Sequence, residues 1–247
     1  MKAQVSSAVV LLGGIAAFAT GAHAGPSPDA TATLTGAPRI EQMVVFRSGA
    51  AIERRVSAKR ATAKVGDRLC SIAARTPMAT LLRADPGPIR FRDYGNCSRR
   101  AADGVGLFVT SIRGERNRGQ DGWVYKVGRE LGTAGAADPA GPFGDGRLKA
   151  GQRVLWLYCR QRSTGSCQRS LEIDTSVDGR ELAVKVTGYD DGGNGVAVAG
   201  ATAIAGDERA TTDGEGGATL TLKPGSYRVR AAKRGAIRSF SERVTIE

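Results

Sequence analysis

Short apolar segments separated by glycine, aspartate and proline recur along this chain, and they restrict it to folds built mainly from strands. One helix signal interrupts them. Thr76-Pro77 is typical of a helix start, MATLLRA follows it, and Asp85-Pro86-Gly87-Pro88 is typical of a helix end. We therefore predict an α+β domain over residues 41–173, with one short helix crossing a mixed sheet. Its strands are QMVVFR, AIERRV, IRFRDY, GLFVTSI, GWVYKV and QRVLWLY.

After Cys167 the helix signals stop and the strands become short and regularly spaced. This pattern is typical of an antiparallel sandwich, so we predict an all-β module, a small β-sandwich, over residues 182–247. The polar stretch DTSVDGRE, residues 174–181, is predicted to be a linker. The strands of the sandwich are LAVKVTGY, GATAIAG, GGATLTL, GSYRVRAAK and RSFSERVTI.

The first residues have the pattern of a secretory signal peptide, which we place at residues 1–24. Lys2 begins a basic region, Ala8 to Ala19 is apolar, and Ala22-His23-Ala24 is a small-x-small cleavage site. A membrane anchor is the alternative, but the apolar run is shorter than the ~20 residues of a spanning helix. Residues 25–40 are predicted to be a flexible arm. We expect a secreted, extracellular protein with no membrane anchor and no intracellular nucleic-acid partner.

An even number of cysteines in an exported chain indicates disulfides. Four cysteines allow three pairings, of which we favour the nearest in sequence, Cys70–Cys97 and Cys159–Cys167. A four-thiolate zinc site is the alternative, although the chain has no CxxC pair.

Loss of the signal peptide would also remove His23, the only histidine. A chain without imidazole excludes a Ser-His-Asp triad, a Cys-His pair and every His-containing metal site. The chemistry that remains is a carboxylate pair of the glycosidase type, and Glu115 and Asp121 flank one loop. We expect a protein that is not an enzyme and has no cofactor or bound metal. An unrecognised extracellular hydrolase is the alternative.

Positive charge is concentrated in the first part of the chain. Residues 39–169 hold 25 Lys and Arg against 11 Asp and Glu, a balance of +14, whereas residues 170–247 hold 10 against 12, a balance of −2. Outside a cell, a basic surface favours anionic partners such as cell-wall polymers, acidic glycans, phospholipid headgroups or free nucleic acid. The alternative is compositional, because Arg outnumbers Lys 28 to 8 and the charge would then serve solubility.

Three motifs in order resemble the β-grasp domain family of the transcobalamin C-terminal domain, which has bacterial secreted members. They are GLFVTSIRG, DGWVYKVG and LKAGQRVLWLYC, and the resemblance covers roughly residues 42–158. The chain departs from the family at Gly128-Arg129, where relatives have an Asn-Gly turn, and in the long loop 130–147. The resemblance implies a β-grasp-like fold and, as one alternative, a cobalamin-type small-ligand binder.

The last part of the chain is similar to carboxypeptidase-regulatory-like and collagen-adhesin B-type sandwich modules. The motifs GVAVAGATA, TTDGEGGATLTL and KPGSYRVRAAKRG carry this resemblance, over roughly residues 182–246. It implies a spacer or binding module. Some of these modules have a Lys–Asn isopeptide bond, but Asn194 is the only asparagine in this half and we expect no such bond.

A candidate ligand surface centres on the aromatic strand GWVYKV. Trp123 and Tyr125 share one face of this strand, and Arg113, Arg116 and Arg118 lie in the loop before it. Rings could stack on a glycan or another flat ligand, and the arginines could bind an anion. The alternative is that the rings form a buried core together with VLWLY, which alternates in the same way.

Two polar stretches are interpreted as turns. Residues 190–194, DDGGN, have part of a calcium-loop pattern but lack its bidentate glutamate. In TTDGEG, residues 211–216, we expect the aspartate to cap local amides and a glycine to take the left-handed conformation. Together these observations predict a secreted, non-catalytic binding or surface-interaction protein for an anionic cell-envelope polymer or glycan.

Overall fold

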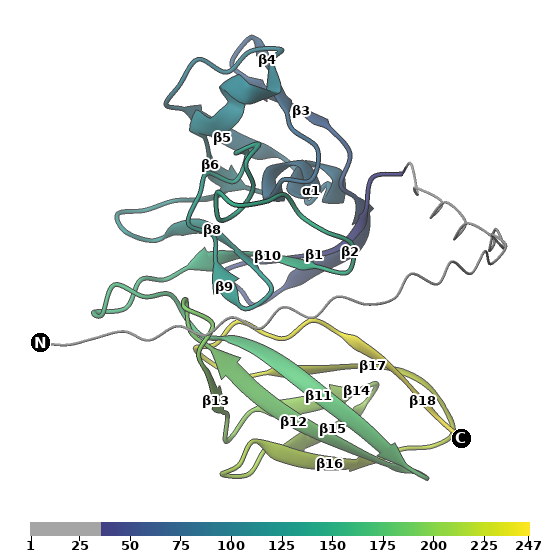
Figure 1. The fold of residues 1–247 in the computed structure, drawn as a ribbon. Helices are drawn as coiled ribbons and strands as arrows, with labels where there is room; N and C mark the ends of the chain where they lie inside the picture. The colour runs from purple at the N-terminus through teal and green to yellow at the C-terminus, as the bar shows by residue number, and fades with distance from the viewer. Residues whose placement is uncertain (1–35) are drawn as a thin grey trace, which may run out of the picture. The chain divides into compact units, whose positions relative to one another are not determined.

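A five-stranded sheet organises the first part of the chain in the computed structural model, which describes residues 36–247 (Figure 1). Its strand order is β2-β1-β10-β8-β9, and all neighbours are antiparallel except β1 and β10, which are parallel. A mixed sheet is therefore present as predicted, but it does not contain the predicted strands IRFRDY and GLFVTSI, which belong to a separate sheet. The strands of the five-stranded sheet are β1 (Arg39–Val45), β2 (Ala51–Ser57), β8 (Gly122–Val127), β9 (Glu130–Leu131) and β10 (Arg153–Cys159).

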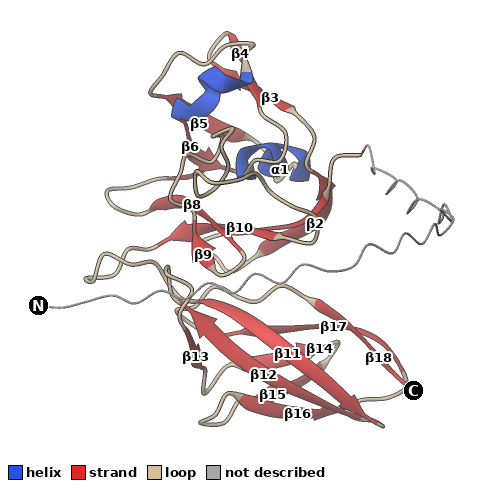
Figure 2. Ribbon diagram, viewed as in Figure 1, coloured by secondary structure: helices blue, strands red, loops and turns tan. Residues whose placement is uncertain are grey.

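The predicted signal peptide and most of the predicted arm lie outside the described residues, and the first two residues of β1, Arg39 and Ile40, fall within that arm. Within residues 36–247 the protein is mostly β, with one α-helix and one 3-10 helix, Ala101–Gly106 (Figure 2). Neither helix of this part has the length and apolarity that crossing a bilayer requires.

The predicted helix is α1, Pro77–Ala84, and its two ends follow the expected local rules. The Thr76 side chain accepts a hydrogen bond from the Ala79 amide at 3.2 Å, and Pro77 occupies the first turn. Asp85 ends the helix in the left-handed conformation, with φ at 45°. Met78 and Leu81 are fully buried against the sheet, and this burial holds so short a helix in place.

Both faces of the five-stranded sheet are covered, which explains why β10 is an almost continuous apolar run. One face, with Trp156 and Tyr158, joins the core beneath α1. On the other face, Leu155 and Leu157 pack in a second cluster that includes Ile237, from the far end of the chain.

Two smaller sheets complete the first part. The hairpin β3–β4 precedes α1, and the antiparallel sheet β5-β6-β7 follows it. Disulfides join Cys70 to Cys97 and Cys159 to Cys167, as predicted. The strands are β3 (Ala61–Val65), β4 (Arg68–Ile72), β5 (Ile89–Asp93), β6 (Leu107–Ile112) and β7 (Glu115–Arg116).

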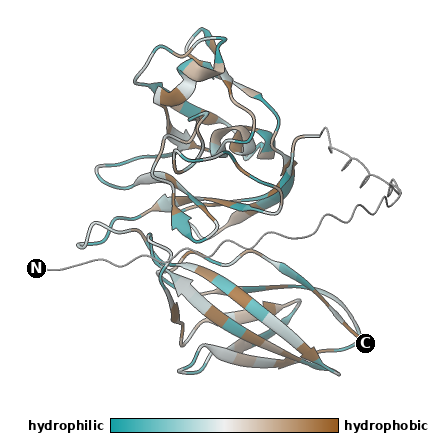
Figure 3. Ribbon diagram, in the orientation of Figure 1, coloured by the Kyte–Doolittle hydropathy of each residue, from teal (hydrophilic) through white to brown (hydrophobic). Residues whose placement is uncertain are grey.

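The last part of the chain contains two four-stranded antiparallel sheets that share one apolar core, as predicted for a sandwich. Apolar and polar residues alternate along β11 and β12, which Figure 3 shows as alternating brown and paler bands. One sheet has β11 (Ser170–Asp178), β12 (Glu181–Tyr189), β13 (Gly195–Ala197) and β16 (Gly217–Thr221). The other has β14 (Thr202–Ala205), β15 (Glu208–Thr211), β17 (Gly225–Ala232) and β18 (Glu242–Ile246).

Residues 174–181 are predicted to be a linker, but in the structure they form the end of a β-hairpin. They contain the end of β11, a tight turn and the first residue of β12, and Asp178 pairs with Glu181 across that turn. Gly179 has φ at 53°, which a tight hairpin turn requires. The stretch is polar because it is the solvent-exposed end of a hairpin.

Candidate functional site

Trp123, in the aromatic strand β8, is a core side chain and not an open stacking surface. It is only 2% exposed, and its ring packs edge-on against Phe46 and Tyr158, with centroids 5.8 and 5.7 Å away. Its indole N–H donates to the carbonyl oxygen of Glu115 at 2.8 Å. The ring therefore belongs to the buried core, which is the alternative that the sequence left open, and little of its surface is exposed.

Tyr125 is also buried, and the long loop that follows β9 closes over it. The hydroxyl donates to the carbonyl oxygen of Ala134 at 2.6 Å and also contacts that of Pro142 at 3.2 Å. Burial raises the pKa of this phenol, and the Asp138 carboxylate acts in the same direction. Tyr125 therefore anchors the loop, and its hydroxyl is not free to bind a ligand.

These buried rings nevertheless form the floor of a pocket of about 410 Å³, which we call the aromatic hollow. Its floor contains Trp123, Tyr125 and Trp156, and its rim contains Tyr94, Val105 and Phe108. The three rim residues are 67, 48 and 44% exposed, and they are half of the large apolar side chains that stay exposed among residues 36–247. Exposed apolar groups gathered around one pocket are typical of a binding site.

A basic surface adjoins the hollow on the outer side of the sheet β5-β6-β7. Arg90 and Arg92 alternate on β5 and are exposed, and Arg116 is exposed on β7. The three arginines and Phe108 line one depression, which we call the arginine face. Within residues 36–247 none of these arginines has a carboxylate within 4 Å. Their guanidinium groups are therefore available to an external anion.

A stack of side chains separates the arginine face from the aromatic hollow. The Arg92 guanidinium lies over the Tyr94 ring, 4.8 Å from its centroid, and the Tyr94 ring packs edge-on against Phe108 at 6.2 Å. Both rings line both depressions. A ligand in the hollow would thus lie beside a row of cations.

The structure separates the three arginines that the sequence grouped together. Arg116 belongs to the arginine face, but Arg113 lies in the β6–β7 turn with φ at 50° and its guanidinium 5.5 Å from the Phe46 ring. Arg118 pairs through its backbone with Asp121 in the next turn. Sequence reasoning missed Arg90 and Arg92, although their alternation in IRFRDY places them on one face of a strand.

Glu115 and Asp121, the candidate catalytic carboxylates, each accept a hydrogen bond from a backbone amide. Glu115 accepts a hydrogen bond from the Arg47 amide at 2.9 Å, and Asp121 accepts one from the Gln161 amide at 2.8 Å. Each carboxylate thus fixes the backbone of a neighbouring segment.

Lys126 is a buried cation that the sequence did not indicate. Its ammonium is fully buried and donates to the carbonyl oxygens of Asp190 and Tyr189, at 2.6 and 3.3 Å, and to the Ser170 hydroxyl at 3.3 Å. The Asp191 carboxylate lies 3.6 Å away, which makes an ion pair but not a hydrogen bond. Burial lowers the pKa of Lys126, while the carboxylate of Asp191 opposes that shift.

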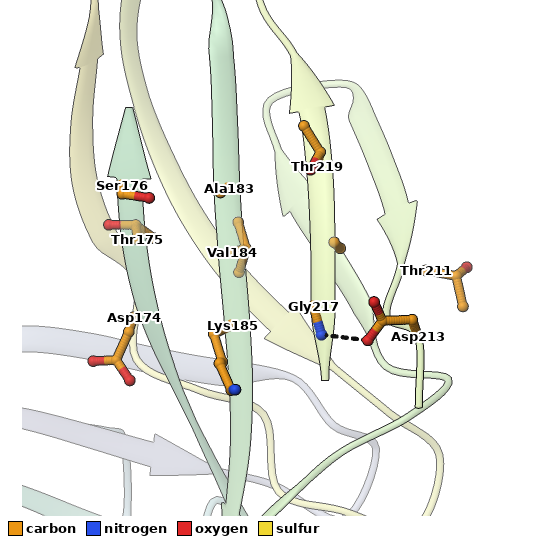
Figure 4. Close-up of a pocket in the computed structure, with 11 residues that line it drawn as sticks. Asp174, Thr175, Ser176, Ala183, Val184, Lys185, Thr211, Asp213, Gly217 and Thr219 are labelled. Carbon is orange, nitrogen blue, oxygen red and sulfur yellow. Dashed lines mark hydrogen bonds between the residues drawn. The ribbon is translucent and has the colours of Figure 1, made fainter. Parts of the chain in front are cut away.

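In both predicted turns, an aspartate carboxylate accepts hydrogen bonds from backbone amides of the same turn. The Asp190 carboxylate accepts hydrogen bonds from the amides of Gly192 and Asn194. Asp213 likewise accepts from Gly217, at 2.8 Å, beside a shallow pocket lined mostly by short side chains of β11, β12 and β16 (Figure 4). Gly216 has φ at 78°, as predicted for this turn. Both aspartates therefore have a structural role.

No protein-family model, curated protein or solved structure matches this chain.

Proposed function

We propose that this is a secreted, non-catalytic binding protein that attaches to an anionic cell-envelope polymer or glycan through the arginine face. The observation that carries the proposal is the set of three exposed arginines on one side of β5-β6-β7, none of them ion-paired within residues 36–247. Such a set has no partner in that part of the chain, and it stands in the segment with a charge balance of +14.

The chemistry of the face suits a polymer of this kind. A guanidinium binds carboxylate or phosphate through two parallel hydrogen bonds, and neighbouring arginines on a rigid sheet hold fixed spacings. Phe108 lies between the arginines, directly opposite Arg92 in the register of β5 and β6. An exposed ring of this kind can pack against the apolar side of a sugar ring.

The remaining features support secretion and a modular arrangement. Two disulfides suit an oxidising compartment. The parallel pairing of β1 with β10, with α1 packed on the sheet, supports a β-grasp-like domain, and the two packed sheets that follow support a sandwich module in the role of spacer.

Cosedimentation with isolated bacterial cell walls at low salt tests this proposal. We expect the wild-type protein to pellet with the walls, and the R90Q/R92Q/R116Q variant to remain mostly in solution. R180Q/R209Q/R243Q is the matched control, because it removes three exposed arginines from the sandwich part. Equal pelleting of the two variants would mean that the arginine face is not the attachment surface.

A further inference from the structure

We infer that the aromatic hollow is a second binding site, for an aromatic carboxylate whose ring enters the hollow while its anionic group stays at the rim. The arginine part of this inference rests on the proposed function, whereas the apolar part stands on the geometry of the hollow alone.

The floor of the hollow favours an apolar group, because the hydrogen-bonding groups of its side chains already have partners. The Trp123 indole donates to Glu115, the Trp156 indole donates to Pro77 at 3.4 Å, and the Tyr125 hydroxyl donates to Ala134. A polar group placed among these rings would lose its water without gaining a partner. The part of the ligand that packs on this floor is therefore expected to be hydrocarbon.

The shape and composition of the wall favour a ring over a chain. The three floor residues and two of the three rim residues are aromatic. Aromatic surfaces pack best with another ring, in offset or edge-on contacts. About 410 Å³ exceeds the roughly 150 Å³ of a cavity that holds benzene, so one ring with a substituent fits.

The cation beside the rim of the hollow indicates that the ligand is an anion. Arg92 lies over Tyr94, and Tyr94 forms part of the wall of the hollow, so this guanidinium stands beside the rim. It has no carboxylate partner within residues 36–247. A carboxylate on a short tether from the buried ring would reach this edge, where water still solvates it.

The two tryptophans of the chain allow a direct test, because both line the hollow. We would titrate 3-phenylpropanoate into the full-length protein and follow the two indole N–H signals by NMR. Both signals should shift saturably. The neutral 3-phenylpropanamide should bind about tenfold more weakly, and propanoate, which lacks the ring, should cause no saturable shift.

Variants locate the site and separate it from polymer attachment. V105Q should weaken binding of 3-phenylpropanoate about tenfold, whereas V196Q, at a valine with the same 48% exposure in the sandwich part, should leave it unchanged. R92Q should weaken binding of the carboxylate but not of the amide. V105Q should still pellet with cell walls as the wild type does, so failure at this site and failure of the proposed function give different results.

Three results would overturn the inference. The first is the absence of a saturable indole shift up to the solubility limit of 3-phenylpropanoate. The second is equal affinity of V105Q and V196Q. The third is binding of decanoate without binding of 3-phenylpropanoate, where V105Q weakens the binding of decanoate. The hollow would then be a site for an acyl chain.

Discussion

The Lys126 ammonium donates a 2.6 Å hydrogen bond to the carbonyl oxygen of Asp190 and so ties the five-stranded sheet to the loop after β12. Lys126→Met would leave this carbonyl and the buried carboxylate oxygen of Asp191 without their cation. We expect a decrease of about 3 kcal/mol in the free energy of unfolding, measured by urea denaturation. The exposed Lys185 offers a control, and K185M should change stability by less than about 0.5 kcal/mol. A decrease no larger in K126M than in K185M would contradict this role.

The stability contributed at Lys126 should rise with pH. Burial holds the pKa of Lys126 below its unfolded value of about 10.4, although Asp190 and Asp191 oppose the shift and Arg169 adds to it. Between the folded and the unfolded pKa, the unfolded chain binds more protons at this position, so the free energy of unfolding increases with pH.

The difference in unfolding free energy between wild type and K126M isolates this effect, since other groups cancel. That difference should grow from pH 7 to pH 10. A difference that stays constant or shrinks over this range would show that the folded state does not disfavour the charged lysine.

The two disulfides should contribute unequally. Cys70 and Cys97 are 27 residues apart in sequence, while Cys159 and Cys167 are 8 apart. The longer loop restricts the unfolded chain more, so replacing both of its cysteines with alanine should cost about 3.5 kcal/mol, against about 2.5 kcal/mol for the shorter loop. Thermal unfolding of the two double variants gives the comparison, and the reverse order would contradict the chain-entropy argument.

Close packing against Tyr125 requires glycine at position 132. A Cβ atom at this position would overlap the ring of Tyr125, which is itself held by Ala134 and cannot withdraw. We expect Gly132→Ala to destabilise the protein by about 2 kcal/mol. Gly214→Ala is the control, because a Cβ there meets no atom within 4 Å. Equal unfolding midpoints for the two variants would show that the loop adapts.

Local features of the fold could be predicted from the sequence because they depend on neighbours in the chain. Thr76 and Pro77 mark the helix start through their own hydrogen bonding and backbone angle, and the nearest cysteines pair because short loops bring them together. The strands of the sandwich are indicated in the same local way, by alternation and by the turns between them.

Features that depend on distant residues could not be predicted. The alternation of β8 indicates two faces for Trp123 and Lys126, but it cannot show that the second face is also covered, by residues more than 40 positions later. The arginine face likewise requires the register that places Arg92 opposite Phe108 and adds Arg116 from a third strand. Sequence reasoning found only the last of these arginines.

The salt dependence of binding to a soluble anionic polysaccharide tests whether the protein attaches through the arginine face. The affinity of the wild-type protein, measured by calorimetry, should fall steeply as NaCl is raised from 50 to 200 mM, because each guanidinium that pairs with the polymer displaces counterions. In R90Q/R92Q/R116Q the slope of log affinity against log salt should decrease by about two, since three guanidinium–anion pairs no longer form, while R180Q/R209Q/R243Q keeps the wild-type slope. Slopes reduced equally in both variants, or a wild-type affinity that salt does not change, would contradict an attachment through the arginine face.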